Sequence, residues 1–292
     1  MAIKLYTTQY AGIVPSIFEA KSAYLRVFGG AIQTIQGAEA DEDFLKLKIS
    51  DTDVVIQEYS TDPDVAFGAG TGNSNRFGPR KEVKSIDATV EFDQPLAIHE
   101  GIDKFTVNDI PDQVVAERLA LHAVAWAERY DEVMLDTISE YANRTLTGEL
   151  SEDGVTDVFV EARKHFVNNK VSKNINWVAF VTPDVYNFLI DSDLATTAKN
   201  SSANVDTQTL YQFKGFILEE LSDDKFKEDE QIYFAAENVG VAGLGIPVTR
   251  AIDSEDFAGV ALQGAGKLGK YIPEKNRVAI LKATLTEAVP GS

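Results

Sequence analysis

The sequence predicts an α+β protein in which an arm and an extended β-hairpin precede one very long helix and a smaller α/β domain. Two patterns carry this prediction. From about Phe44 to Val107, apolar residues alternate with polar ones in a way that is typical of half-buried strands. From about Asp109 to Thr147 the period is helical, and no glycine interrupts it. With 292 residues, 44% of them hydrophobic, the chain can bury one large core or two smaller ones.

Residues 1–43 are predicted to form the arm. A short helix is expected from about Val14 to Phe28, and Gly29 and Gly30 end it. Its apolar residues include Ile17, Phe18, Ala20, Tyr24, Leu25 and Phe28. A single short helix cannot bury so many large side chains by itself, so we expect it to lie on another surface.

Residues 44–100 are predicted to form the hairpin. In the first limb Leu45, Leu47 and Ile49 alternate with lysines, and an apolar triplet at 54–56 continues the strand. In the second limb the apolar positions are Ile86, Ala88, Val90 and Phe92. The segment 61–80 between the limbs is rich in Gly, Asn and Pro, which predicts a mobile tip, and loops of this length are usually functional.

The long helix is predicted to begin with Asn108 or Asp109 as its cap and to end at Gly148. One stripe of helical spacing contains Val115, Leu119, Trp126, Tyr130, Val133 or Met134, Ile138 and Tyr141. At ~1.5 Å per residue the helix would reach roughly 55 Å, which is longer than one compact domain covers. We therefore expect it to need packing partners along its whole length.

The remaining chain predicts an α/β layer, because helices and buried strands alternate at short intervals. Helices are expected at 155–169 and from Thr182 to about Asp191, where Pro183 can occupy the first helical position. Strands are expected at 177–181, 213–220, 232–236, 257–262 and 277–284.

The composition excludes several classes of function. The chain has no cysteine, which rules out disulfides, thiolate metal sites and cysteine nucleophiles and fits a cytoplasmic protein. Its net charge of −19 disfavours direct recognition of nucleic acid, although an acidic wall could enclose nucleic acid without binding it. The first residues do not resemble a signal peptide and no apolar run is long enough for a membrane span, so we expect neither secretion nor insertion.

No catalytic, cofactor-binding or metal-binding residues are predicted. Gly264, Gly266 and Gly269 have the spacing of a dinucleotide-binding loop, but a β-like run follows them instead of a helix. We therefore expect a glycine-rich turn between strands. The histidines at 99, 122 and 165 lie in different predicted elements, which argues against a shared metal ion.

One basic cluster departs from the acidic background. It comprises Arg76, Arg80, Lys81 and Lys84 on the descending side of the hairpin tip, with Glu82 among them. The cluster could simply keep the loop soluble, or it could dock on an acidic neighbour, because complementary charge guides association. The acidic stretches at 39–43 and 219–224 are candidate partners under the second alternative.

Three segments, together with the order of the elements, are similar to one known family. They are Ala125-Trp-Ala-Glu-Arg-Tyr-Asp131 in the long helix, the stretch 177–189, and the tail segments 257–262 and 270–273. Over nearly its whole length the chain resembles the major capsid protein of tailed bacteriophages, which has the Hong-Kong-97-type (HK97-like) fold. The resemblance implies an arm at 1–43, an extended loop at 44–100, a peripheral domain with a spine helix at 101–153 and about 241–275, and an axial domain at 154–240 and about 276–292.

The resemblance further implies a structural, non-enzymatic subunit that assembles through pentamers and hexamers into an icosahedral shell around phage DNA. The shell would form in the bacterial host cytoplasm and become part of the virion, with a separate scaffolding protein and a portal protein as partners. It would need no cofactor or membrane, and it would enclose double-stranded DNA without binding it specifically. The candidate inter-subunit contacts are Arg76, Arg80, Lys81 and Lys84 at the hairpin tip and Phe18, Tyr24 and Phe28 in the arm.

Two alternatives remain open at this point. An encapsulin-type compartment would share the fold and differ in what it contains. An α/β enzyme would need a pocket in which titratable groups converge, and the sequence offers no such cluster.

Overall fold

The computed structural model describes residues 22–30, 32–35, 43–50, 55–62, 64–66, 75–80, 82–83, 85–93, 95–105, 112–191, 203–204 and 209–287. Met1–Asp41 and Phe92–Ser292 form one compact unit and Glu42–Glu91 forms another, and each unit is considered by itself. Phe18, Lys81, Lys84 and the predicted start of the long helix lie outside the described residues.

The long helix α3 spans Asp112–Glu140, which is 29 residues, and so extends about 43 Å. The predicted stripe is confirmed, because Val115, Leu119, Tyr130, Val133, Met134 and Ile138 are all buried. Among the described residues, no helix combines the length and the apolar character that a bilayer span requires.

The predicted end of this helix at Gly148 is wrong. Arg144–Leu150 forms strand β5, which pairs in parallel with the last strand of the chain. Gly148 lies inside β5, where an added Cβ would stand 2.8 Å from Cγ2 of Val158 on the next helix. This glycine therefore permits close packing and does not terminate a helix.

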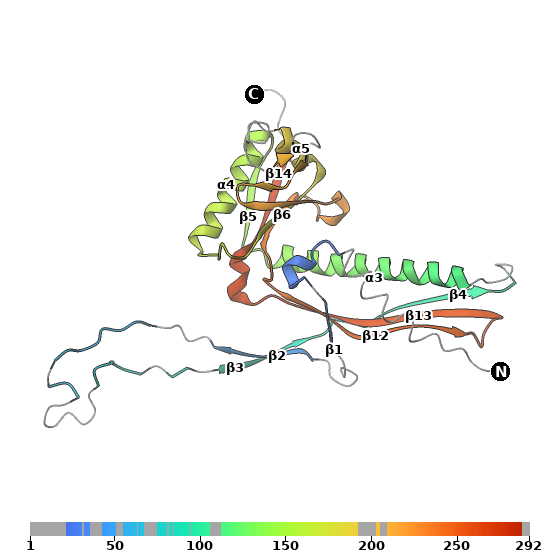
Figure 1. Cartoon of the computed structure of the whole chain (residues 1–292), viewed down its shortest axis with the longest axis horizontal. Coiled ribbons are helices and arrows are strands. Elements are labelled where there is room, and N and C mark those ends of the chain that lie inside the picture. Colours follow the sequence, from blue (N-terminus) through green and yellow to red (C-terminus); the bar gives the residue numbers. More distant parts are fainter. Residues whose placement is uncertain are drawn as a thin grey trace. The chain divides into compact units, whose positions relative to one another are not determined.

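Helix α3 lies along one face of a four-stranded sheet (Figure 1). The strand order is β1 (Gln33–Ile35), β12 (Val241–Asp253), β13 (Gly259–Tyr271) and β4 (Leu96–Asp103). Strands β12 and β13 form a hairpin with 13 residues in each strand, and β4 pairs antiparallel with β13. Strand β4 therefore belongs to this sheet, although the sequence places most of it in the extended loop at 44–100.

The predicted glycine-rich turn at 264–269 is wrong, because these residues lie inside β13. Close side-chain neighbours explain two of the glycines. A Cβ on Gly264 would be 3.3 Å from Nε1 of the Trp126 indole on α3, and a Cβ on Gly266 would be 3.1 Å from Leu244 Cδ1 on β12. Glycine lets α3 approach the sheet closely, and it also removes the apolar alternation by which a strand is identified in a sequence.

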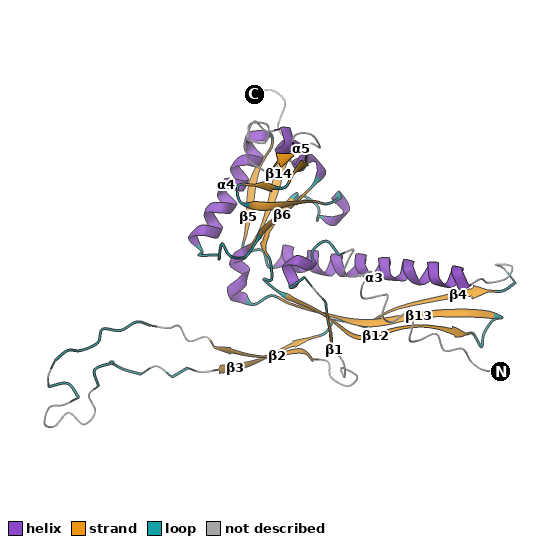
Figure 2. Cartoon of the chain, in the orientation of Figure 1, coloured by secondary structure: helices purple, strands orange, loops and turns teal. Residues whose placement is uncertain are grey.

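A six-stranded sheet forms the α/β part. Its order is β5, β14 (Ile280–Glu287), β11 (Ile232–Ala236), β6 (Trp177–Val181), β10 (Phe216–Glu220) and β9 (Gln212–Phe213). Helices α4 (Glu152–Asn168) and α5 (Pro183–Asp191) accompany it (Figure 2). The predictions for α4, α5, β6 and β11 are confirmed, and every residue of β6 and β11 is buried.

One predicted strand is divided, and the two tail strands have other bounds than the sequence predicts. The segment 213–220 consists of β9 and β10, because Lys214 and Gly215 turn the chain with positive φ. The two tail strands begin at Gly259 and Ile280, and the 3-10 helix Glu274–Ala279 precedes β14. The remaining short elements are the 3-10 helix Asp223–Lys225 and the paired strands β7 (Ala203–Asn204) and β8 (Thr209–Leu210).

Helix α3 contributes to two separate hydrophobic cores, which accounts for its length. Its C-terminal half, through Tyr130 and Ile138, packs into the main core with the six-stranded sheet and α4. Its N-terminal half, through Leu119, packs on Ile102 and Leu262 of the four-stranded sheet. The partners that the length of the helix requires are therefore present within this chain.

The unit Glu42–Glu91 is built on one antiparallel pair of strands, β2 (Asp43–Ser50) and β3 (Ser85–Glu91). The predicted hairpin is thus confirmed. The predicted continuation of its first strand at 54–56 is wrong for the described residues, because Val55 and Ile56 are irregular and exposed. They lie beyond the last residue pair of the ladder, where neither face is covered by a second layer.

The described part of the arm contains a 3-10 helix, Leu25–Phe28, which ends where the sequence predicts. Gly29 follows it in the left-handed region with φ of 96°, a conformation that favours glycine. Gly30 N donates a hydrogen bond to Leu25 O at 2.9 Å. The predicted start of this helix near Val14 lies outside the described residues.

Candidate functional site

The arm segment 22–28 lies in the main core of its own chain. Tyr24 and Phe28 are buried, and the Tyr24 ring packs on Phe180 with ring centroids 4.8 Å apart. The Tyr24 hydroxyl donates a hydrogen bond to the carbonyl of Lys225. These two rings retain no exposed surface for a neighbouring subunit, which corrects the prediction for Tyr24 and Phe28. The surface on which this segment lies belongs to the same chain.

A buried carboxylate of α3, Asp131, holds the same segment. It accepts hydrogen bonds from Ser22 Oγ at 2.7 Å and from Ala23 N at 3.0 Å, and Lys225 Nζ lies 3.4 Å from it. Asp131 is only 2% exposed. Sequence reasoning missed this contact, although a carboxylate directly after Tyr130 in the buried stripe of a helix signals the need for a partner.

Arg26 forms a second link between the arm segment and the α/β sheet. Its guanidinium lies 2.6 Å from Glu237 Oε1 and 3.3 Å from Glu219 Oε2. Burial raises the pKa of the Glu219 carboxyl, and the attraction of Arg26 opposes this only in part. The segment is therefore held both by apolar packing and by charge.

A third polar cluster joins α3 to the six-stranded sheet through Glu230. The carboxylate lies 2.6 Å from Lys282 Nζ, and it accepts hydrogen bonds from Tyr233 Oη at 2.5 Å and from Ser139 Oγ at 3.0 Å. Burial alone would raise the pKa of Glu230, but these three donors outweigh it and hold the pKa below its ordinary value. The cluster is a structural junction in which the Glu230 carboxylate is contacted by three donors.

The guanidinium of Arg76 bonds to the backbone of its own hairpin tip. Nε donates to Val65 O at 3.2 Å and Nη2 donates to Asp62 O at 3.3 Å, while Ser60 N donates to Arg76 O at 2.9 Å. Arg76 thus joins the two limbs of the tip, whereas Arg80 is exposed. The two lysines of the predicted basic cluster lie outside the described residues, so a docking role for the cluster stays a prediction.

The same tip presents large apolar side chains to solvent. Ile56 is 97% exposed and Phe77 is 76% exposed, and Val55 and Val83 are also exposed. Tyr59 meets Phe77 edge to face, with ring centroids 5.1 Å apart. A two-stranded hairpin has no second layer in which to bury such groups, and exposed apolar patches mark interaction sites. These five residues, the apolar tip, form the candidate interaction surface of the hairpin unit.

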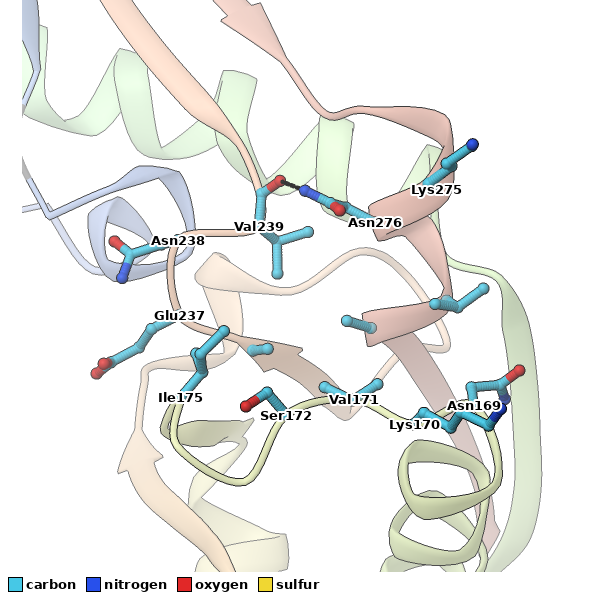
Figure 3. Close-up of a pocket in the computed structure, with 13 residues that line it drawn as sticks. Asn169, Lys170, Val171, Ser172, Ile175, Glu237, Asn238, Val239, Lys275 and Asn276 are labelled. Atoms are coloured by element: carbon cyan, nitrogen blue, oxygen red, sulfur yellow. Dashed lines mark hydrogen bonds between the residues drawn. The ribbon is translucent and has the colours of Figure 1, made fainter. Parts of the chain in front are cut away.

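A pocket of about 250 Å³ lies between the loop after α4 and the 3-10 helix before β14 (Figure 3). Ile175 and Val239 contribute to its lining, and Asn276 Nδ2 donates to Val239 O at 2.8 Å. The side chains of Lys275 and Glu237 point away from it in Figure 3. Among the described residues that line the pocket, no acid and base converge as catalysis requires.

The histidines lie in three different elements, as the sequence indicates: His99 in β4, His122 in α3 and His165 in α4. Within the described ranges, no three His, Asp or Glu side chains are grouped so that they could hold a metal ion. His122 Nε2 lies 2.9 Å from Glu100 Oε2, and Arg118 Nη2 lies 2.5 Å from Glu100 Oε1. The hydrogen bonds from Arg118 and then His122 hold the pKa of Glu100 below its ordinary value.

No family model matches the sequence, and no curated protein sequence matches it. Solved structures do match. The capsid structure of the cyanophage P-SCSP1u has a TM-score of 0.68 at 9% identity, covering 91% of this chain and 89% of that chain. The asymmetric unit of the bacteriophage PhiM1 mature capsid has a TM-score of 0.66 at 12% identity, and the match covers 92% of this chain and 88% of that chain. A virus-like particle from Pyrococcus furiosus has a TM-score of 0.52 at 11% identity, and the match covers 95% of this chain and 99% of that chain.

Proposed function

We propose that this chain, which has the fold of phage capsid proteins, is the subunit that builds the icosahedral shell of a tailed bacteriophage. The observation that carries the proposal is the match to two phage capsid structures along about nine tenths of both chains, at TM-scores of 0.66 and 0.68. The predicted fold class is confirmed by the same match. The shell function is the step that we add.

The uneven burial of the chain supports an assembly role. The apolar tip of the hairpin unit stays exposed, with Ile56 and Phe77 almost free of cover, although the main core elsewhere is tightly filled. Apolar surface of this kind gains free energy when it is buried against another subunit. Repeated over closed symmetric contacts of ~1,600 Å² each, modest interfaces give a stable shell.

We assign a structural and not a catalytic role to the polar clusters. Asp131, Arg26 and Glu230 each join two elements that are distant in the sequence. Their donors and acceptors are engaged in these junctions, which is the arrangement that stability requires of buried polar groups. This supports a structural role for the three clusters.

The charge of the chain supports a container for DNA. A net charge of −19 repels phosphate, so packaged double-stranded DNA would be enclosed without adhering to the wall. We place the protein in the virion, after assembly through pentamers and hexamers in the host cytoplasm with a scaffolding protein and a portal protein. The arm, hairpin, peripheral and axial division at 1–43, 44–100, 101–153 with 241–275, and 154–240 with 276–292 remains part of this proposal, except that residues 96–100 pair within the four-stranded sheet and residues 144–150 within the six-stranded sheet.

An encapsulin-type compartment is the second candidate. The match to the virus-like particle from Pyrococcus furiosus covers 99% of that chain. Its TM-score of 0.52 is nevertheless below those of the two phage capsids. The same fold serves both functions, so the contents of the particle discriminate between them. Nuclease-resistant DNA in particles from infected cells supports the phage shell, and a single packaged protein species supports the compartment.

Expression of the full chain with and without a co-expressed scaffolding protein, followed by negative-stain electron microscopy, tests the proposal. We expect closed shells, or rings of five and six subunits, in at least one of the two conditions. A monomer or small dimer in both conditions would overturn the shell function.

A further inference from the structure

A basic region surrounds the end of helix α4 in this acidic chain. Residues 162–176, which comprise the last turns of α4 and the loop after it, contain four lysines or arginines and no acidic residue. The 3-10 helix before β14, which lines a pocket together with this loop, adds Lys275. The helix dipole favours cations in the last turn of α4, but Lys170, Lys173 and Lys275 lie outside that helix. We call these three lysines the basic rim.

The basic rim has no acidic partner among the residues that the structure describes. All three lysines are exposed, and none of them forms an ion pair with a described carboxylate. Within the described lining of the pocket the only acid is Glu237, which pairs with Arg26 at 2.6 Å and accepts a hydrogen bond from Asn176 Nδ2 at 2.9 Å. The rim therefore carries positive charge that a carboxylate from another molecule can neutralise.

The pocket beside the basic rim has apolar walls on two sides. Figure 3 shows Val239 on one side of it and Val171 and Ile175 on the opposite side. Val239 is buried, whereas Ile175 is 40% exposed at the opening. The volume of about 250 Å³ is below the ~300–1,000 Å³ that is typical of small-molecule sites, so the pocket suits one large apolar side chain.

Hydrogen bonds hold both walls in place. The indole Nε1 of Trp177 donates to Ser172 O at 3.2 Å and fixes the loop that carries one wall. Asn276 Nδ2 donates to Val239 O at 2.8 Å and fixes the other wall. The pocket is thus formed before a partner arrives, which lowers the entropic cost of binding.

The chemistry of the pocket favours a peptide over nucleic acid. Proteins bind single strands by stacking bases on aromatic rings and bind phosphates through the planar fork of arginine, and the described lining of this pocket contains neither group. A peptide with an apolar side chain between carboxylates would fill the pocket and pair with the rim. The acidic stretch 219–224 of a second copy does not fit, because its apolar residue Leu221 packs against the main core of its own chain.

We propose that this pocket and the basic rim bind an acidic peptide of a different protein, in which one large apolar side chain stands between carboxylates. The apolar side chain enters between Val239 and Val171 and supplies most of the affinity. The carboxylates pair with the lysines of the rim and orient the peptide. This inference goes beyond the shell function and does not depend on it.

Fluorescence anisotropy with the full-length protein tests the site. The probe is a labelled synthetic peptide that has one phenylalanine with glutamates on both sides, and the matched peptide has serine in place of the phenylalanine. The protein variants are the double substitution Lys170→Glu with Lys275→Glu and, as the control with the same change of charge, Lys104→Glu with Arg250→Glu at exposed positions on the four-stranded sheet. A labelled single-stranded oligonucleotide and a labelled peptide of residues 51–64 are measured alongside.

We expect saturable binding of the phenylalanine peptide and about tenfold weaker binding of the serine peptide. The rim substitutions should weaken binding of the phenylalanine peptide about tenfold, and the control substitutions by less than about twofold. Equal affinity for the two peptides, or equal weakening by the two pairs of substitutions, would overturn the site. Tighter binding of the oligonucleotide would indicate a nucleic-acid site, and tighter binding of the 51–64 peptide would indicate a contact between copies; either result would overturn the proposal.

Discussion

Replacing Asp131 by alanine should loosen the arm segment from the long helix. The carboxylate accepts hydrogen bonds from Ser22 Oγ and Ala23 N, and it is 2% exposed. Each hydrogen bond to a buried charge contributes about 1.5 to 3 kcal/mol, and the Ala23 donor would be left without its acceptor. The ion pair with Lys225 adds little, because its 3.4 Å separation is long and the lysine is partly exposed.

We therefore expect Asp131→Ala to lower the free energy of unfolding by about 3 kcal/mol, and Asp131→Asn, which keeps one oxygen, by about 1 to 2 kcal/mol. Urea unfolding of the unassembled subunit, followed by tryptophan fluorescence, measures the change. Trypsin should also cut sooner after Arg26 in the alanine variant, because the segment opens more often.

Asp136→Ala on the same helix is the matched control. Asp136 is exposed and pairs with Lys227 at 2.9 Å, so its loss should cost less than about 0.5 kcal/mol. If Asp131→Ala costs no more than Asp136→Ala, the carboxylate does not hold the arm segment and the reasoning fails.

Three further predictions concern other parts of the chain. Because the pKa of Glu230 is lowered in the folded state, the carboxylate stabilises the fold above about pH 4.5 and loses this effect as the pH falls further; Glu230→Gln should flatten the acid limb of a stability–pH curve. Gly259→Ala would drive a Cβ into the carbonyl oxygen of Ile102 and should cost about 3 kcal/mol in urea unfolding, whereas Gly264→Ala should cost about 1 kcal/mol. Phe77→Asp at the apolar tip should leave the free energy of unfolding within about 0.5 kcal/mol of wild type yet abolish particles in light scattering, and unchanged particle yield would contradict its role.

Elements with a strong local period could be predicted from the sequence. Helices α3, α4 and α5 and strands β6 and β11 each carry an uninterrupted apolar stripe or run, which depends only on neighbouring residues. Strand β5 and the part of β13 after Leu262 could not be predicted in this way. The glycines at 264 and 266 predict a turn. The contact that explains Gly264 in a strand is with the Trp126 ring, more than 130 residues earlier in the sequence, and the one that explains Gly266 is with Leu244 on the neighbouring strand.

The candidate site could be predicted only in part for the same reason. The unusual composition of the hairpin tip is visible in the sequence, and so is its basic cluster. The use of Arg76 to join the two limbs depends on carbonyl groups that folding brings to it. In the sequence, Tyr24 and Phe28 look like contact residues for another subunit. The surface that covers them, which includes Phe180, is formed by distant segments of the same chain and cannot be recognised from neighbouring residues.

The particle mass of the full-length protein, measured by light scattering after expression with a scaffolding protein, tests the central claim most directly. We expect particles of megadalton mass built from 32.0 kDa subunits. A monodisperse 32.0 kDa species, folded and with its hairpin intact, would contradict it.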